Sequence, residues 1–560
     1  MNALFFRNPR LLSLVLLMLL VAGLSALATL PRLEDPIITN RVGVVITPFP
    51  GANAERVEAQ VSEPVEEALR TLAEVDTISS TSRPGLSTVT VELQESIFEV
   101  EPVWSRIRDR LGDVAVTLPA GAGTPDLDDE RGYAYTLIVG LVWELPPPAN
   151  RAILGRFADE LQNRLRNLPG TDLVRLFGEP AEEIQVLVDP DQLVAAGLSS
   201  RAVADAIARA DAKVAAGQLV NDTHHFSIEL SGELDSLARI REVPLAEGGQ
   251  GRILQVADVA RVRRAVADPP ASLSRVGERP AVVIAARMEA RQRVDLWAAE
   301  ARRIVEDFRG ELPAGVGLST LFEQSGYTEE RLGTLVGNLL TGAAIVVVVL
   351  FLTLGWRSAL IVATALPLTT LLALAGLKWL GMSIHQMSVT GLIVALGLLV
   401  DNAIVMVDAI GTRLRRGEEA QRAVAASIAR LWIPLLASTL TTVLAFMPII
   451  LLPGPAGEFV GGIGVSVAAA LISSYILSQT VIPALAGRWL GASRRRGWWR
   501  TGLGAGPLGR VFAASLDLSL AHPGLSMLAA FTLAVLGFVG ASTLTEQFFP
   551  SADRDQFHIQ

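Results

Sequence analysis

Seven runs of about 20 mostly apolar residues constrain the fold of this 560-residue chain more than any other feature. A helix of that length crosses the hydrocarbon core of a bilayer, so the runs predict a polytopic α-helical membrane domain. Because about 300 residues separate the first run from the second, a large non-membrane block is also expected. The runs cover residues 11–30, 335–354, 359–380, 387–410, 431–452, 462–485 and 524–544.

The first run is predicted to be a membrane anchor. Arg7 and Arg10 precede it, and Ala26-Leu27-Ala28 is similar to a cleavage site, as in a signal peptide. The run is longer than a signal-peptide core, however, and it continues up to that site. A spanning helix is therefore the better interpretation.

The arginines between the runs indicate on which side of the membrane each loop lies. Five occur in residues 411–430 and six in residues 486–523, whereas the expected connection at 454–461 has no Lys or Arg. Alternating seven spans from a cytoplasmic N-terminus puts both arginine-rich segments in the cytoplasm, as the positive-inside rule requires. The block at 31–333 then lies outside the cytoplasm.

Charge and cysteine content exclude some classes of protein. The net charge is −9, and no basic patch with interleaved aromatic residues is present, so nucleic acid is not an expected partner. The absence of cysteine fits a chain with a large face in an oxidising compartment. No P-loop pattern is present either, so ATP hydrolysis is not the expected energy source.

The block at 31–333 alternates strand and helix patterns, which predicts an α+β fold. A stripe of apolar residues from Val57 to Leu72 predicts a helix, and Pro64 inside it predicts a kink. Further helices are expected near 153–168, 199–211 and 294–308, and strands near 41–47, 87–93, 173–177 and 183–188.

Residues 215–230 are expected to form a projecting hairpin that contains His224 and His225. Adjacent histidines point to opposite sides of a strand, and no Cys or carboxylate triad nearby completes a metal site. They are therefore interpreted as exposed hairpin residues, and no metal is expected.

The seventh run matches the first without gaps. Pro9 aligns with Pro523, Gly23 with Gly537 and Pro36 with Pro550, always at an offset of 514. Val21 and Leu30 also match Val535 and Leu544. Two flanking prolines at the same separation indicate a duplicated unit, a common plan in transporters. The chain is thus predicted to be the first half of a two-repeat architecture.

Asp401 and Asn402 are the only polar residues in the apolar stretch 391–407. A carboxylate at that depth costs several kcal/mol, and such residues usually carry ions, protons or gating charge. Gly397, Asp401 and Asp408 are four and seven residues apart and share one helix face. Burial disfavours the charged carboxylate and a nearby cation favours it, so protonation could follow local geometry. The alternative is an Asp bound by Ser or Thr hydroxyls as a structural pin.

Several motifs resemble the resistance–nodulation–division (RND) efflux transporters, and within them the hydrophobe/amphiphile efflux permeases of Gram-negative bacteria. The resemblance covers essentially the whole chain, and its motifs occur in the family's order. They are Phe49-Pro-Gly-Ala-Asn-Ala-Glu-Arg-Val-Glu58, Glu63-Pro-Val-Glu-Glu-Ala-Leu69, Ser79-Ser-Thr-Ser-Arg-Pro-Gly-Leu-Ser87 and Gly397-Leu-Leu-Val-Asp-Asn-Ala-Ile-Val405.

The resemblance implies a bacterial inner-membrane protein with a periplasmic porter domain of ferredoxin-like βαβ subdomains. It implies a first transmembrane helix at 1–30, porter subdomains at 31–134 and at 135–180 with 272–333, a docking subdomain at 181–271, transmembrane helices 2–6 at 334–487, a cytoplasmic connector at 488–523, a seventh helix at 524–544 and the start of a second periplasmic domain at 545–560.

The same resemblance assigns roles to the polar residues of the fourth run. Many family members carry two consecutive aspartates there, paired with a lysine from the second half. Here the second position is Asn402, which does not titrate, so Asp401 is expected to be the proton carrier. Other family members are similar in having Asn there. For Asp408, near the cytoplasmic end of the span, a helix-end role is favoured over transport.

Two aromatic residues are candidates for the substrate pocket that the resemblance implies. Tyr135 lies in Tyr135-Thr-Leu-Ile-Val-Gly140 and Phe177 in Leu173-Val-Arg-Leu-Phe-Gly178. Aromatic faces bind varied amphiphiles through area and stacking. Either residue could instead belong to an ordinary core.

The predicted function is proton-coupled export of hydrophobic or amphiphilic compounds, without an enzyme activity and with the proton gradient in place of a cofactor. The resemblance implies a homotrimer joined to a periplasmic adaptor and an outer-membrane channel. The alternatives are a heavy-metal or lipid exporter of the same superfamily, or a non-transporting membrane scaffold or sensor. The 8 scattered Met residues argue against a Cu(I) exporter.

Overall fold

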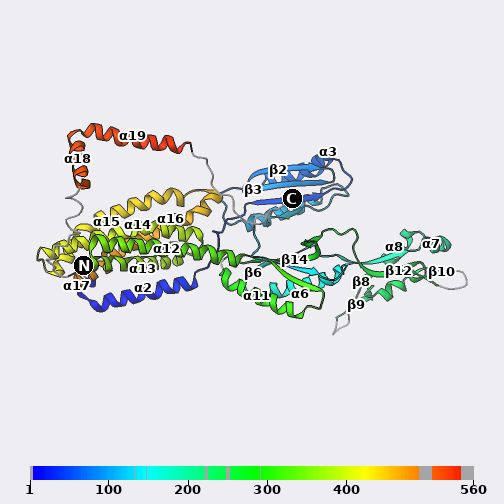
Figure 1. The fold of residues 1–560 in the computed structure, drawn as a ribbon. Helices are drawn as coiled ribbons and strands as arrows, with labels where there is room; N and C mark the ends of the chain where they lie inside the picture. The colour runs from blue at the N-terminus through cyan, green and yellow to red at the C-terminus, as the bar shows by residue number, and fades with distance from the viewer. Residues whose placement is uncertain are drawn as a thin grey trace.

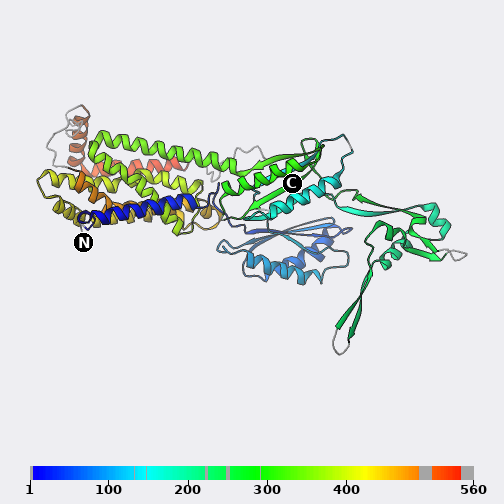
Figure 2. The same ribbon diagram turned by 90° about the horizontal axis from the view of Figure 1, so that it is seen from below.

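A computed structural model describes residues 4–130, 133–146, 148–220, 225–247, 253–290, 292–490 and 507–543. Figure 1 shows an elongated molecule with a helical bundle at one end and a block of sheets at the other. Figure 2 shows the same two parts from below. The expected start of a second external domain, at 545–560, lies outside the described residues, as does His224.

The described part of the chain contains seven helices long and apolar enough to span a membrane, as the sequence predicts. They are α2 (Pro9–Thr29), α12 (Gln324–Leu354), α13 (Trp356–Trp379), α14 (Gln386–Arg415), α15 (Ala420–Ile450), α16 (Gly454–Gln479) and α19 (Pro523–Ala541). A short α1 (Leu4–Arg7) precedes the first span. Helices α17 (Val481–Trp489) and α18 (Pro507–Ala521) follow α16.

The predicted connection at 454–461 is wrong, because α16 begins at Gly454. Pro455 stands in its first turn, where a missing N–H removes no helical hydrogen bond. Only residues 451–453 therefore join α15 to α16. Glycines of this part of α16 instead allow close helix packing, as at Gly462, where an added Cβ would lie 2.7 Å from the His385 ring.

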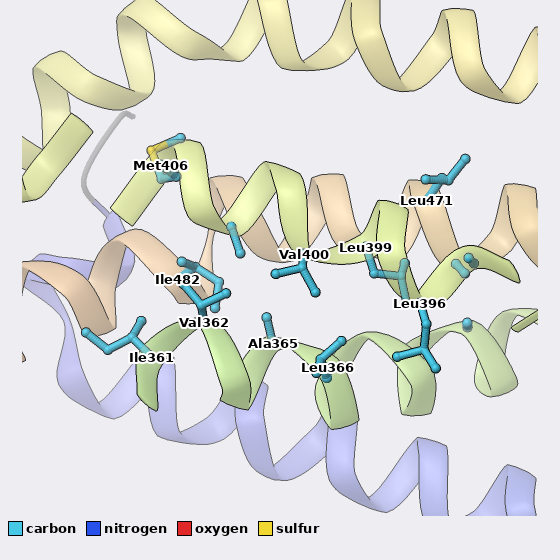
Figure 3. Close-up of a cluster of buried hydrophobic side chains, with 14 of the residues drawn as sticks. Ile361, Val362, Ala365, Leu366, Leu396, Leu399, Val400, Met406, Leu471 and Ile482 are labelled. Carbon is cyan, nitrogen blue, oxygen red and sulfur yellow. The ribbon is translucent and has the colours of Figure 1, made fainter. Parts of the chain in front are cut away.

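Small residues bring the helices of the bundle together. A Cβ added to Gly391 of α14 would lie 2.6 Å from the Ile463 carbonyl oxygen of α16, and one added to Gly23 of α2 would lie 2.5 Å from Leu371 Cβ of α13. Helices in lipid associate through such close packing, because lipid tails are as apolar as the side chains. Around these contacts the core is aliphatic, as Figure 3 shows for Val362, Leu396 and neighbours on α13, α14, α16 and α17.

The first sheet of the external block has four antiparallel strands in the order β2-β3-β1-β4. Its elements follow as β-α-β-β-α-β, a split βαβ arrangement. They are β1 (Val42–Pro48), the helical segments α3 (Ala54–Val57), η1 (Glu58–Ser62) and α4 (Glu63–Arg70), β2 (Val75–Arg83), β3 (Leu86–Leu93), α5 (Glu101–Ala115) and β4 (Asp126–Asp128).

The kink predicted at Pro64 takes the form of a π-helical turn, η1, that ends two residues before the proline. Proline removes one helical hydrogen bond, and a π turn accommodates such a break without ending the helix. Just before the proline, Ser62 Oγ lies 2.8 Å from Ser82 Oγ and 2.7 Å from Ser87 Oγ. Ser62, which lies just before the motif at 63–69, therefore contacts the motif at 79–87.

The second sheet repeats the arrangement of the first. Strands β6, β14, β5 and β15 lie side by side in that order, all antiparallel, and β13 pairs with the start of β14. Its elements are β5 (Leu137–Trp143), α6 (Arg151–Arg166), β6 (Thr171–Phe177), β13 (Ser274–Val276), β14 (Arg279–Met288), α11 (Val294–Glu311) and β15 (Val316–Glu323). Helix α12 starts directly after β15, so this sheet continues into the membrane bundle.

A separate unit is inserted between β6 and β13. Strands β7 (Glu182–Val188) and β12 (Ala260–Val266) pair antiparallel at its base. The expected hairpin is present as β8 (Ala212–Val220) and β9 (His225–Gly232), and it projects far from the rest of the chain in Figure 2. The other elements are α7 (Pro190–Ala196), α8 (Ser200–Ala210), α9 (Leu237–Arg241), β10 (Pro244–Glu247), β11 (Ile253–Gln255) and α10 (Val256–Val259).

Candidate functional site

One face of α14 is exposed along the length of the helix. Val394, Gly397, Asp401, Val405 and Asp408 lie on it, at steps of three or four residues. The prediction that Gly397, Asp401 and Asp408 share a helix face is confirmed. The opposite face packs into the bundle, so the acidic residues look away from the other described helices.

Asn402 has the opposite surroundings to its neighbour Asp401. Its side chain is buried between three helices, where Nδ2 lies 3.4 Å from Thr439 Oγ1 of α15 and 3.5 Å from Ser474 Oγ of α16. The Ser474 hydroxyl in turn donates to the Leu399 carbonyl at 2.6 Å. The hydroxyl-bound structural pin considered for Asp401 therefore describes Asn402.

Asp401 has no hydrogen-bond or ion-pair partner among the described residues. The helix-packing role predicted for Gly397 is not found among them either, since an added Cβ there would meet nothing within 4 Å. Gly397 lies on the exposed face with Asp401, whereas Gly391 lies on the packed face and makes the close contact with α16. Position on the helix decides which glycine packs.

Asp408 lies two turns before the end of α14, and its carboxylate is 3.8 Å from the Arg415 guanidinium. The Asp408 side chain is 65% exposed. An exposed pair of this length contributes little to stability. Its place at the basic end of the helix matches the helix-end interpretation, and the structure does not join it to Asp401.

Tyr135 and Phe177, the two candidates for a substrate pocket, do come together. Their rings meet edge to face with centroids 5.9 Å apart and an interplanar angle of 83°. Tyr135 lies two residues before β5 and Phe177 ends β6, so the rings come from two strands on either side of β14. Phe177 remains 43% exposed, which leaves part of the ring free to contact a ligand.

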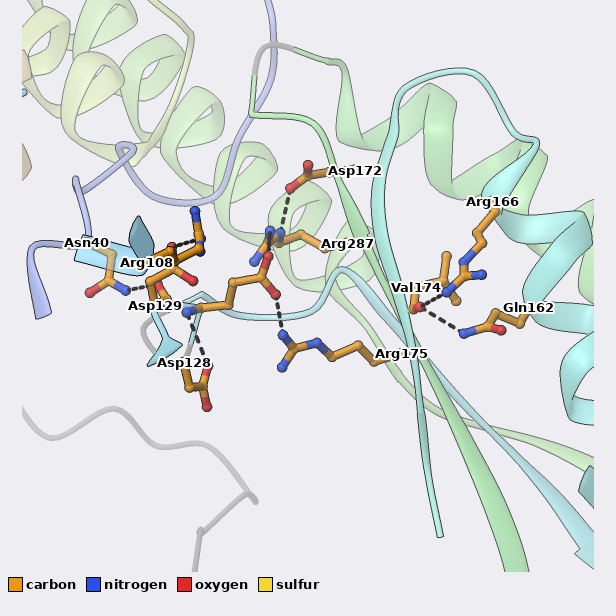
Figure 4. A network of polar contacts seen from close by, with 11 residues as sticks. Asn40, Arg108, Asp128, Asp129, Gln162, Arg166, Asp172, Val174, Arg175 and Arg287 are labelled. Carbon is orange, nitrogen blue, oxygen red and sulfur yellow. Dashed lines mark hydrogen bonds and ion pairs between the residues drawn. The ribbon is translucent and has the colours of Figure 1, made fainter. Parts of the chain in front are cut away.

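Charged residues surround the aromatic pair, and sequence reasoning missed them. Glu130 forms ion pairs with Arg175 at 2.7 Å and with Arg287 at 3.5 Å. Arg287 also forms an ion pair with Asp172 at 2.7 Å (Figure 4). Arg287 lies over the Tyr133 ring, 4.6 Å from its centroid.

This ion-pair network places charged groups next to the Tyr135 and Phe177 rings. Burial raises the pKa of the Tyr135 phenol, and the nearby Arg175 lowers it by a smaller amount, so the phenol stays neutral near pH 7. Arg175 stands two residues before Phe177 on the same strand and so points to the same side. The two-residue period of side chains along a strand could therefore have placed Arg175 beside Phe177 from the sequence.

A family model described as the AcrB/AcrD/AcrF family matches residues 1–560 of the chain. The chain belongs to this family. The family is one of inner-membrane transporters rather than enzymes, in agreement with the predictions of family, transport class and location.

Individual relatives are distant. The chain is 23% identical to an uncharacterized transporter of Haemophilus influenzae over 568 residues, which is 99% of this chain and 53% of the relative. It is 23% identical to the multidrug resistance protein MdtC of Yersinia pestis over 556 residues, 98% of this chain and 54% of the relative. For MdtC of Pectobacterium atrosepticum the identity is 23% over 505 residues. The chain spans about half the length of the curated relatives that it matches.

Proposed function

We propose that the chain forms the first half of a proton-driven exporter in which Asp401 carries the proton. The observation that supports this most directly is the contrast between two adjacent residues. Asn402 has its hydrogen bonds within the bundle, whereas Asp401 lies on an exposed face of an apolar helix without a partner among the described residues. A carboxylate in that position needs a proton or a cation beside it.

The proposed chemistry follows from this arrangement. A cationic side chain from a second half, a lysine by family resemblance, would approach the face that carries Gly397 and Asp401. Close approach would favour the carboxylate, and withdrawal would favour the protonated acid. Asn402 cannot titrate, so one carboxyl group per chain would take up and release the proton.

The external block supplies the proposed substrate path. The two split βαβ sheets would be ferredoxin-like porter subdomains, and the unit inserted between β6 and β13 a docking subdomain. Tyr135 and Phe177 would bind hydrophobic or amphiphilic compounds through ring area. The working assembly would be a homotrimer with a periplasmic adaptor and an outer-membrane channel. The name of MdtC, a multidrug resistance protein, supports this substrate class.

The two-repeat plan is part of the same proposal. Gly23 of α2 packs against α13, whereas the matching Gly537 of α19 meets nothing within 4 Å among the described residues. A second half would supply the helix that packs on α19, as α13 packs on α2.

The test is dye extrusion from cells that express the full-length gene product. Asp401→Asn is expected to abolish proton-driven extrusion while expression and assembly remain normal. The matched control is Asn402→Ala at the adjacent position, which removes a polar side chain but no titratable group and should be milder. Extrusion retained in Asp401→Asn would overturn the assignment of the proton to this residue.

A further inference from the structure

One ion pair joins the membrane bundle to the first sheet of the external block. Arg41 immediately precedes β1, and Glu458 lies in the second turn of α16. The Arg41 guanidinium lies 2.5 Å from Glu458 Oε1, and the other carboxylate oxygen accepts the backbone N–H of Thr39 at 2.7 Å. Both carboxylate oxygens are therefore held by the segment that leads into β1.

The pair is buried and has further partners on the side of the sheet. The Arg41 side chain is 4% exposed and that of Glu458 is 14% exposed. Arg41 Nε also donates to the Ile97 carbonyl at 2.9 Å, and the guanidinium lies 5.3 Å from the centroid of the Phe98 ring. Removal of one member of a buried pair leaves a charge without a partner, so α16 and β1 can separate only at high cost.

The surroundings make this contact a local one. A cavity of about 960 Å³ lies beside Glu458, between the end of β3 with the loop after it and the connection from α15 to α16. Its walls include Glu92, Gln94, Phe98, Ile450, Leu452 and Glu458. Over that area the sheet and the bundle do not fill the space between them. The ion pair therefore joins the sheet and the bundle at the edge of the cavity.

Helix α16 is also firmly attached to the helix that carries Asp401. Ser474 binds both Asn402 and the Leu399 carbonyl, and Gly391 lets the two backbones approach closely. At the external end, a Cβ on Gly462 of α16 would lie 2.7 Å from the His385 ring at the start of α14. Helices α14 and α16 thus have polar and small-residue contacts along their length, and they are expected to move together.

We propose that Arg41 and Glu458 are positioning residues that transmit movement of the α14–α16 helix pair to the first sheet. This inference rests on the proposed role of Asp401. A shift of α14 on protonation would be carried to Glu458 by α16 and to β1 by the ion pair. Neither residue touches substrate or proton, so their loss would slow turnover without changing substrate binding.

The test compares hydrogen exchange and transport in the full-length gene product. Asp401→Asn mimics the protonated acid and is expected to change the exchange rate of residues 42–48 by about threefold or more. In Glu458→Gln this response of β1 should disappear, while α14 still responds. In Glu458→Gln alone the maximal extrusion rate should fall about tenfold, and the substrate KM should stay within about twofold of its natural value.

Two further variants complete the design. The charge-swapped double variant Arg41→Glu/Glu458→Arg keeps an ion pair at this place, and it should restore part of the β1 response and of the extrusion rate if Glu458→Gln loses them. Glu311→Gln breaks the exposed pair with Arg164, whose atoms are 2.7 Å apart within the second sheet unit, and should leave both measurements unchanged.

The outcomes separate this inference from the proposed function. A β1 response that persists in Glu458→Gln overturns the role of the ion pair. A substrate KM that changes more than about twofold together with the turnover rate in that variant also overturns the role, since it would indicate general damage. Should Glu458→Gln fail to fold, Arg41→Lys, which keeps the charge and loses the contact with Ile97, takes its place. Extrusion that survives Asp401→Asn, with Glu458 intact, instead refutes the proton carrier itself.

Discussion

Ser474 Oγ of α16 lies between two groups of α14, 3.5 Å from Asn402 Nδ2 and 2.6 Å from the Leu399 carbonyl that it binds as a donor. The hydroxyl therefore fixes the rotation of α14 next to the residue that we propose as the proton carrier. Because Asn402 is held toward the bundle, Asp401 must point away from it. This relationship can be tested by removing one hydroxyl group.

Ser474→Ala is expected to lower the free energy of unfolding by about 1 kcal/mol, because hydrogen bonds between membrane helices average somewhat less than that. The measurement is thermal unfolding in detergent. Asn402→Ala should cost less in the Ser474→Ala background than in the natural chain, since the two residues share one contact. Thr441→Val is the control: among the described residues its hydroxyl binds the Ala437 carbonyl of its own helix. Equal losses in Ser474→Ala and Thr441→Val would contradict the prediction.

Alanine at two glycines of α14 should have opposite effects on stability. Gly391→Ala places a Cβ 2.6 Å from the Ile463 carbonyl oxygen, and overpacking of this kind costs about 1–3 kcal/mol. Gly397→Ala meets no atom within 4 Å among the described residues and should gain helix propensity, up to about 1 kcal/mol. Thermal unfolding of the two variants checks the sign. A stable Gly391→Ala variant would show that the α14–α16 contact is looser than described.

Gly397 also offers a test of a second half that packs on the exposed face of α14. Gly397→Leu should leave the fold of the first half intact, because nothing described lies within 4 Å. It should nevertheless abolish proton-driven extrusion by the full-length gene product, since a helix that approaches Asp401 must pass this position. Val394→Leu, on the same face but already carrying a side chain, is the matched control. Normal extrusion in Gly397→Leu would argue against close packing there.

His385 predicts a loss of stability in acid. It caps α14 through Nδ1, which accepts from the Ser388 N–H, and burial lowers its pKa from 6.5 to about 4. The folded protein therefore keeps a neutral ring between these values, while the unfolded chain takes up a proton. Stability is fully present above pH 6.5 and falls as the pH drops toward 4, by a few kcal/mol at about 1.4 kcal/mol per pKa unit.

Thermal unfolding between pH 7 and pH 4 measures this effect. His385→Asn keeps a capping side chain but does not titrate, so it should show a flatter profile over that range. A variant with the same pH dependence as the natural chain would assign the loss to other groups.

Phe177→Ala should reduce extrusion of an aromatic dye several-fold while changing the stability of the sheet little, because the Phe177 side chain is already 43% exposed. Phe177→Leu keeps apolar area without the ring and should give an intermediate rate. Extrusion of an aromatic and of an aliphatic amphiphile from cells separates the two effects. Equal extrusion rates for the natural chain, Phe177→Ala and Phe177→Leu would show that Phe177 does not contact the substrate.

The spanning helices were predictable because apolar runs of membrane length have few alternatives. Their ends were less so. Helix α12 begins at Gln324, eleven residues before the predicted run, since its first turns are polar and carry no apolar pattern. The connection expected at 454–461 is wrong because the first turns of α16 are less apolar than the run that follows, so the run begins later than the helix does.

The shared helix face of Gly397, Asp401 and Asp408 was predictable from their spacing, but the side to which that face turns was not. Between Gly391 and Val407 every residue except Asp401 and Asn402 is apolar, so periodicity could not show which of these two side chains faces the bundle. The Glu130 network and the Arg41–Glu458 pair were missed for another reason. Their members lie far apart in the sequence, 417 residues in the second case, and only the folded chain brings them together.

The unit between β6 and β13 enters and leaves the molecule at a single place. Glu182, at the start of β7, pairs with Val266, at the end of β12, so the two ends of an 85-residue stretch lie side by side. A stretch joined in this way can be exchanged for a shorter or longer one, with its two cut points closed by a turn and the parent sheet undisturbed. The fold thereby allows this unit to vary without disturbance of the sheet from which it extends.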